Sequence, residues 1–123
     1  MYNYEPIMRN DNDNPILKLT IEFALEIITY SEKLEENKKF VIARQILKSG
    51  TSIGANVREA QNAESKADFI HKIKIAAKEA DETEYWLTLC NQSSHYPKNE
   101  VLNEKLKSII NIISKIIITA KSK

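Results

Sequence analysis

Apolar residues recur at three- and four-residue steps through almost the whole of this chain, and this periodicity limits its fold more than any other feature. Such steps place side chains on one face of an α-helix, whereas a half-buried β-strand requires alternation at every second residue. Only two glycines and three prolines occur among the 123 residues, so few positions interrupt a helix. The sequence therefore predicts an all-α protein and argues against a β or α/β fold.

Polar and turn-forming residues divide the periodic sequence into four predicted helices. Asn14-Pro15 begins the first helix, because asparagine is a good N-cap and proline is tolerated at the first helical position. Ser65, followed three residues later by Asp68, is similar to a capping box and begins the third helix. We expect helices over about 15–36, 40–62, 66–92 and 99–120, in a domain at 14–121 that follows a flexible segment at 1–13.

Four helices of this length with short connections typically form an antiparallel up-down-up-down four-helix bundle. A chain of 123 residues can bury a core without a disulfide or a structural metal. The single Cys90 fits a reducing cytoplasm, and the polar segment Met1–Asn14 does not resemble a signal peptide. The most apolar stretch, Ile109–Ala120, is too short and too polar to span a bilayer. We therefore expect a soluble cytoplasmic domain with no membrane contact.

The middle of the second predicted helix, Ser49–Asn56, consists largely of small residues that are poor helix formers. Each glycine in a helix costs roughly 1 kcal/mol relative to alanine. We expect the segment to be helical because the apolar period continues through it, and a loop between two short helices is the alternative. Gly50 and Gly54 would lie on one face, where another helix of this chain or of a neighbouring copy can approach closely.

The fourth predicted helix is apolar over more than half of its circumference. Ile110, Ile112 and Ile118 lie outside its main apolar stripe. A helix with such a broad apolar surface needs contacts on two sides. These isoleucines therefore predict that the protein self-associates.

No group of residues has the spacing of a catalytic or metal site. His71 and His95 are far apart, Cys90 has no CxxC partner, and the glycines lack the lysine-serine ending of a P-loop. A di-iron bundle needs Glu-x-x-His on two helices, and Asp68-x-x-His71 is a single, imperfect match. We therefore expect a protein that is not an enzyme and that has no metal, no cofactor and no small-molecule substrate.

Four acidic residues between 79 and 84 are distributed around the third helix and do not converge. We expect them to be solvated or paired with basic side chains, with Glu79 and Glu82 facing bases of the second helix. Trp86 follows this acidic cluster, and its indole N–H is expected to find a hydrogen-bond partner at the edge of the core.

The charges are unevenly distributed, although the formal net charge is only +1. Residues 1–37 carry three basic and eight acidic side chains, whereas residues 38–78 carry nine basic and three acidic ones. Such blocks can pair within a bundle, between subunits or with a polyanion, and internal pairing or solvation is the purely structural interpretation. The candidates for nucleic-acid contact are the basic residues Arg44, Lys48, Arg58, Lys66, Lys72, Lys74 and Lys78.

Two short basic rows, Arg44 with Lys48 and Lys74 with Lys78, have the four-residue spacing of neighbours on a helix. They can neutralise a few phosphates, with an affinity that falls as the salt concentration rises. No aromatic stacking platform accompanies them, so the sequence does not support base-specific recognition.

Several segments together resemble one known family. They are Ser49–Asn56, Glu59-Ala60, Ser65–Phe69, Lys78–Ala80 and Glu82–Leu87. They are similar to the four-helix bundle family named for the bacterial 23S rRNA intervening sequence, whose members are often described as ribosomal proteins, and the similarity covers nearly the whole chain. The family name records where the genes occur and does not establish a ribosomal function.

The resemblance implies a bundle that assembles into a homopentameric ring. It also implies kinship with accessory proteins of diversity-generating retroelements, which engage nucleic acid and a reverse transcriptase. With the basic central segment, it predicts a non-enzymatic oligomer that binds rRNA, another structured RNA or a nucleic-acid-processing partner. The alternative is a purely structural protein–protein interaction module, in which the charge blocks pair subunits.

Overall fold

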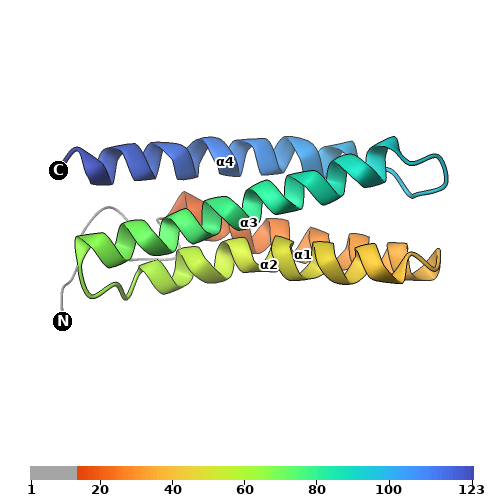
Figure 1. The fold of residues 1–123 in the computed structure, drawn as a ribbon, viewed down its shortest axis with the longest axis horizontal. Helices are drawn as coiled ribbons and strands as arrows, with labels where there is room; N and C mark the ends of the chain where they lie inside the picture. Colours follow the sequence, from red (N-terminus) through yellow and green to blue (C-terminus); the bar gives the residue numbers. More distant parts are fainter. Residues whose placement is uncertain (1–13) are drawn as a thin grey trace.

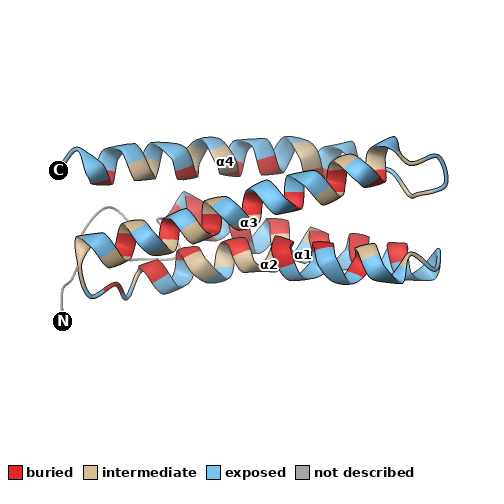
Figure 2. Cartoon of the chain, in the orientation of Figure 1, coloured by how far each residue is buried: buried red, intermediate tan, exposed pale blue. Residues whose placement is uncertain are grey.

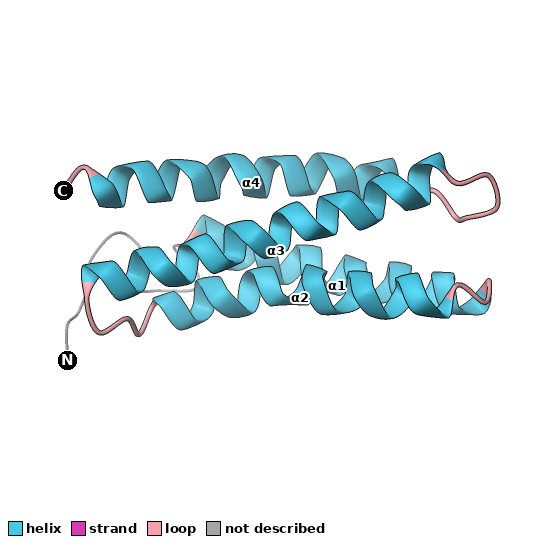
Figure 3. Ribbon diagram, viewed as in Figure 1, coloured by secondary structure: helices cyan, strands magenta, loops and turns pink. Residues whose placement is uncertain are grey.

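The computed structural model describes residues 14–123 as four antiparallel α-helices (Figures 1 and 3). Each helix packs against the next in the chain, and α1 also packs against α4, so the arrangement is an up-down-up-down bundle. This confirms the predicted all-α class, while the predicted flexible segment at 1–13 lies outside the described residues. The helices are α1 Pro15–Glu36, α2 Phe40–Ala60, α3 Lys66–Gln92 and α4 Glu100–Lys121.

Polar side chains cap the helices and explain where they begin. The Asn14 side chain accepts a hydrogen bond from the backbone N–H of Ile16 at 3.2 Å. The Asn99 side chain accepts one from the backbone N–H of Leu102 at 3.1 Å. First-turn N–H groups have no partner within the helix, so these caps stabilise its start. Asn99 is therefore the cap of α4, which begins one residue later than predicted.

Helix α2 ends at Ala60, earlier than the predicted end at residue 62. The backbone N–H groups of Gln61 and Asn62 donate to carbonyls three residues back, each at 3.1 Å, so the last turn tightens. Ser65 then caps α3 by accepting a hydrogen bond from the backbone N–H of Asp68 at 3.0 Å. The predicted capping interaction at the start of α3 is thus confirmed.

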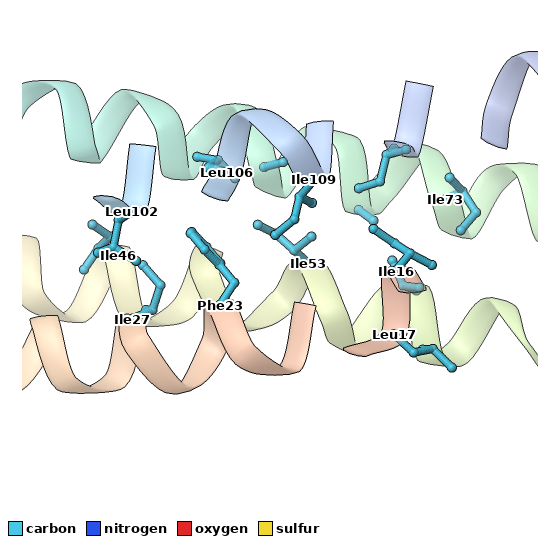
Figure 4. Close-up of a cluster of buried hydrophobic side chains, with 14 of the residues drawn as sticks. Ile16, Leu17, Phe23, Ile27, Ile46, Ile53, Ile73, Leu102, Leu106 and Ile109 are labelled. Carbon is cyan, nitrogen blue, oxygen red and sulfur yellow. The ribbon is translucent and has the colours of Figure 1, made fainter. Parts of the chain in front are cut away.

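The core runs along the bundle axis and takes one stripe of side chains from each helix (Figure 2). Because the stripes repeat every three or four residues, each helix presents a continuous apolar face to the other three. In Figure 4 most of the labelled side chains of α1, α2 and α4, such as Phe23, Ile46 and Leu102, point into the space between the helices. The largest fully buried side chains of the core include Phe23, Ile27, Ile46, Ile53, Phe69, Ile73, Leu87, Leu102 and Leu106.

The two glycines of α2 determine how closely α1 and α2 approach. A Cβ atom on Gly50 would lie 2.9 Å from two side-chain carbons of Ile27, and one on Gly54 would lie 3.0 Å from the Thr20 side chain. The segment is helical throughout, so the alternative of a loop is wrong. The groove predicted at Gly50 and Gly54 is filled by α1 of the same chain.

A buried polar pair joins α2 to α3. The hydroxyl oxygens of Ser49 and Thr83 are 2.9 Å apart, and both residues are fully buried. The Thr83 hydroxyl also donates to the backbone carbonyl of Glu79 at 2.7 Å. A buried hydroxyl without a partner is costly, so this pair specifies the register of the two helices.

Helix α4 uses most of its broad apolar surface within the chain. Ile110 and Ile112 are half-buried and pack against the core. Of the isoleucines predicted to mediate self-association, only Ile118 is largely exposed, at 67%. Contacts to α1 and α3 therefore account for much of the apolar pattern of α4.

Candidate nucleic-acid interface

The seven predicted basic residues are distributed over several sides of the bundle. Arg58 follows Gly54 by one helical turn, and Arg44 lies on the same stripe of α2, so both are at the edge next to α1. Lys48 is exposed, whereas Lys66 is half-buried at the start of α3. The structure therefore does not bring the predicted set together into one surface.

Lys72 is engaged by a carboxylate of the same chain. Its ammonium group donates to Oε1 of Glu59 at 3.2 Å, which joins α3 to α2. This ion pair neutralises the charge of Lys72 locally. Lys72 is thus the predicted phosphate ligand least suited to that role.

Lys74 has another lysine as its neighbour. Its pKa is lowered because the side chain of Lys121 lies close to it and disfavours a second positive charge there. Lys121 ends α4, and the end of α4 lies beside the beginning of α3 (Figure 1). Lys78 is exposed one turn after Lys74 on the same stripe of α3. We call Lys74, Lys78 and Lys121 the lysine cluster.

The lysine cluster combines charges from two helices that are distant in the sequence. Within residues 14–123, no carboxylate forms an ion pair with any of its three members. Like charges held close together create a positive potential that a bound anion relieves. Lys121 was absent from the sequence-based set because its approach to Lys74 depends on the antiparallel arrangement. The topology of a four-helix bundle would have indicated that these two helix ends meet.

The acidic segment of α3 makes structural contacts. The indole N–H of Trp86 donates to Oε2 of Glu82 at 3.1 Å, which confirms the predicted partner at the edge of the core. The ring of Tyr85 packs edge-on against that of Trp86, with ring centroids 5.3 Å apart. Tyr85 follows Lys78 by seven residues, so its exposed ring lies on the same stripe of α3 as the lysines, two helical turns beyond them and beside the acids.

A cavity of about 250 Å³ lies between α1 and the start of α4. Its lining includes Tyr30, whose hydroxyl donates to the carbonyl of Pro97 at 2.7 Å, and Lys98, whose ammonium group donates to the carbonyl of Cys90 at 3.1 Å. These polar groups are thus engaged in holding the α3–α4 connection. Burial raises the pKa of the Cys90 thiol, so the reactive thiolate is disfavoured.

Two further searches of the described residues gave negative results. No group of three or more His, Cys, Asp or Glu side chains in this part of the chain could hold a metal ion. None of the four helices is long and apolar enough to cross a membrane.

Comparison with known proteins identifies one family. Residues 12–119 match the family model described as 23S rRNA-intervening sequence protein. The chain is 45% identical to a protein of unknown function from the S23 ribosomal protein family of Bacteroides thetaiotaomicron, whose crystal structure is known. That structural alignment has a TM-score of 0.79 and covers 83% of this chain and 97% of the other. No curated protein matches the chain.

Proposed function

The chain belongs to the family of 23S rRNA-intervening sequence proteins, and on that premise we propose that it is a non-enzymatic, self-associating bundle that binds structured RNA. The observation that carries this proposal is the lysine cluster, where the packing of α4 on α3 brings Lys74 and Lys121 together and no carboxylate of residues 14–123 pairs with either. Phosphate groups are the RNA component that such a site recognises. An rRNA-like helix is the ligand that the family name suggests.

Recognition of this kind reads the shape and charge of the RNA. Phosphate contacts position a protein on nucleic acid but carry no base information. The exposed ring of Tyr85 lies two helical turns from Lys78 among acids that repel phosphates, so it offers no stacking surface within the cluster itself. The proposal therefore predicts little discrimination between RNA sequences that share a fold.

Self-association would strengthen these contacts. One cluster provides three positive charges, and a homo-oligomer repeats it in each copy, so that weak contacts add through multivalency. The family resemblance implies five copies, and we propose a homo-oligomer of this kind in the cytoplasm. A nucleic-acid-processing protein that shares the RNA would be a further partner.

The test is to measure the affinity for a 23S rRNA fragment over a range of salt concentrations. We expect Lys74→Glu with Lys78→Glu to weaken binding at least about tenfold and to reduce the slope of log K against log salt by roughly 2. The matched control, Lys18→Glu with Lys33→Glu, makes the same charge change on α1, which does not contact α3. Binding that is absent in the wild type, independent of salt, or weakened equally by both variants contradicts the proposal.

A second candidate function is a protein–protein interaction module without a nucleic-acid role. Ile21 and Leu25 favour it, because both are large apolar side chains exposed on α1. This alternative predicts that charge reversal at Arg44 or Arg58 disrupts the oligomer, and that the wild type shows no salt-dependent affinity for RNA. The RNA titration of the wild type therefore separates the two functions, and light scattering reports the assembly of each variant.

A further inference from the structure

Six of the ten large apolar side chains exposed within residues 14–123 lie on α1 and α2, and one of them, Val41, is turned about 100° away from its neighbour Phe40. Each of the other five is more than a third exposed, and Leu25 is the most exposed of these, at 59%. Soluble proteins rarely expose a contiguous apolar patch unless it binds something. We call these residues the α1–α2 face, and they are Ile21, Leu25, Ile28, Phe40 and Leu47.

The contribution of α1 to this face is a single stripe. Ile21, Leu25 and Ile28 are separated by four and three residues, so they are neighbours along the helix surface. Ile21 follows Thr20, which contacts Gly54 of α2, and each residue along a helix is turned by about 100° from the one before. The stripe is thus turned outward from the contact with α2. Glu26 pairs with Lys105 of α4, which places α4 on the other flank of α1.

The residues that α2 contributes to this face lie along its contact with α1. Phe40 and Leu47 are seven residues apart, and Gly54 follows Leu47 by seven more, so all three share one stripe. Gly54 has no side chain, and α1 packs closely beside it. At Gly54, therefore, no side chain separates the apolar surface of α1 from that of α2.

Charged residues at the two edges of the face have opposite signs. Glu32 is exposed one turn after Ile28 on α1, and Arg44 is exposed between Phe40 and Leu47 on α2. Neither charge has an ion-pair partner within residues 14–123. An apolar centre with charged edges is the usual composition of a protein–protein interface.

We propose that the α1–α2 face is covered by a second copy of this chain, with the α1 edge of one copy over the α2 edge of the other. Each copy carries both Glu32 and Arg44, so a second copy supplies the opposite charge to each edge. The inference rests on the self-association in the proposed function and assigns its contact surface. The lysine cluster, on α3 and α4, stays accessible to RNA in this arrangement.

RNA is a poor occupant of the α1 side of this face, although the exposed bases Arg44 and Lys48 lie on its α2 side. The exposed acids Glu32, Glu35 and Glu36 follow the apolar stripe at the end of α1, and they would repel phosphates. A second copy is also the occupant that removes apolar surface from water, which is the main favourable term in association. Stable interfaces bury roughly 800 Å² on each partner, and a patch of large side chains like this one forms their centre.

The first experiment is light scattering of Leu25→Glu at micromolar concentration, beside the wild type. We expect its mass to fall toward the 14.1 kDa of one chain, because a carboxylate at the centre of the face cannot be buried unpaired. The matched control is Ile118→Glu, a similarly exposed apolar position on α4, and it should keep the wild-type mass. Circular dichroism establishes that both variants are folded.

The second experiment tests the edges by mixing variants. Glu32→Arg and Arg44→Glu should each weaken association, because like charges then face each other across the contact. A mixture of the two variants should associate more strongly than either variant alone, because each contact between unlike variants brings opposite charges together, whatever the number of copies. A mixture that associates no more strongly than the separate variants overturns the pairing.

These outcomes distinguish the face from the self-association on which it rests. A wild-type protein with the mass of one chain overturns both. If the assembly survives Leu25→Glu, the α1–α2 face is not the contact surface, although the proposed self-association stands. The same conclusion follows if Ile118→Glu dissociates the assembly and Leu25→Glu does not. Loss of assembly in Leu25→Glu, with mutual rescue of the two charge variants, supports the proposal.

Discussion

Helix α1 has two neighbours and meets them in different ways. Against α2 its backbone approaches closely, because Gly50 has no side chain where Ile27 packs. Against α4 it packs less extensively, and an exposed ion pair between Glu26 and Lys105 and a cavity of about 250 Å³ lie along that side. The contact with α2 depends on a glycine that has no side chain. The contact with α4 includes charged groups whose attraction is partly screened by water. We therefore expect the two sides to tolerate substitution very differently.

The substitution with the largest expected effect is Gly50→Val, at the close contact. A Cβ atom there would already lie 2.9 Å from carbons of the fully buried Ile27, and valine adds two further methyl groups. We expect a loss of about 3 kcal/mol of stability, since overpacking forces buried side chains and backbone to shift. Urea denaturation followed by circular dichroism measures this loss.

The matched control for that variant is Ala55→Val, at an exposed position of the same helix. It brings the same β-branched side chain without the clash, so we expect a cost of less than about 1 kcal/mol from helix propensity. Equal losses of stability at both positions would show that the effect comes from helix propensity. The close contact between α1 and α2 would then not explain the effect of Gly50→Val.

Thr83→Val tests the polar contact between α2 and α3. It leaves the buried hydroxyl of Ser49 without its partner at 2.9 Å, so we expect a loss of about 2 kcal/mol. Adding Ser49→Ala should cost less than the sum of the two single changes, because both remove the same hydrogen bond. Strict additivity in this double-mutant cycle would mean that the two hydroxyl groups do not interact.

Tyr30→Phe tests the looser side of the bundle. It removes the hydrogen bond to the Pro97 carbonyl, and we expect a loss of about 1 kcal/mol near neutral pH. Burial raises the pKa of Tyr30 above its ordinary value of 10.0, so folding favours the neutral phenol. The wild type should therefore lose stability as the pH rises above about 10, through ionisation of the unfolded chain.

The phenylalanine variant lacks this ionisation, so its stability should fall less steeply over the same alkaline range. Denaturation at several pH values gives both curves, and their difference isolates Tyr30 from the other tyrosines and lysines. Parallel curves above pH 10 would contradict the burial of the hydroxyl group.

Glu26→Gln should have the smallest effect. The ion pair with Lys105 joins α1 to α4, but both side chains are more than a third exposed to water. We expect a loss of about 0.5 kcal/mol at low salt and almost none at high salt, because exposed ion pairs are screened. A loss as large as that of Gly50→Val would mean that the two sides of α1 are equally sensitive.

The candidate site was only partly predictable from the sequence. The four-residue spacing of Lys74 and Lys78 was sufficient to place them together on one helix face. The sequence could not distinguish Lys72, which pairs with Glu59, from these two, because an ion pair between helices depends on their relative rotation. Lys121 was missed for a related reason, since it approaches Lys74 only after α4 folds back along α3.

The sequence by itself determined the helices and their number, because helix periodicity, caps and breaks depend on residues a few positions apart. It also identified the family, through small-residue and acidic segments that are local patterns as well. Only the tertiary structure decided how far the apolar residues beside each predicted stripe are buried. Ile27 and Ile28 are chemically identical neighbours in α1, yet one is fully buried under Gly50 and the other is exposed on the α1–α2 face. That choice depends on how four helices rotate to share one core, which no single helix encodes.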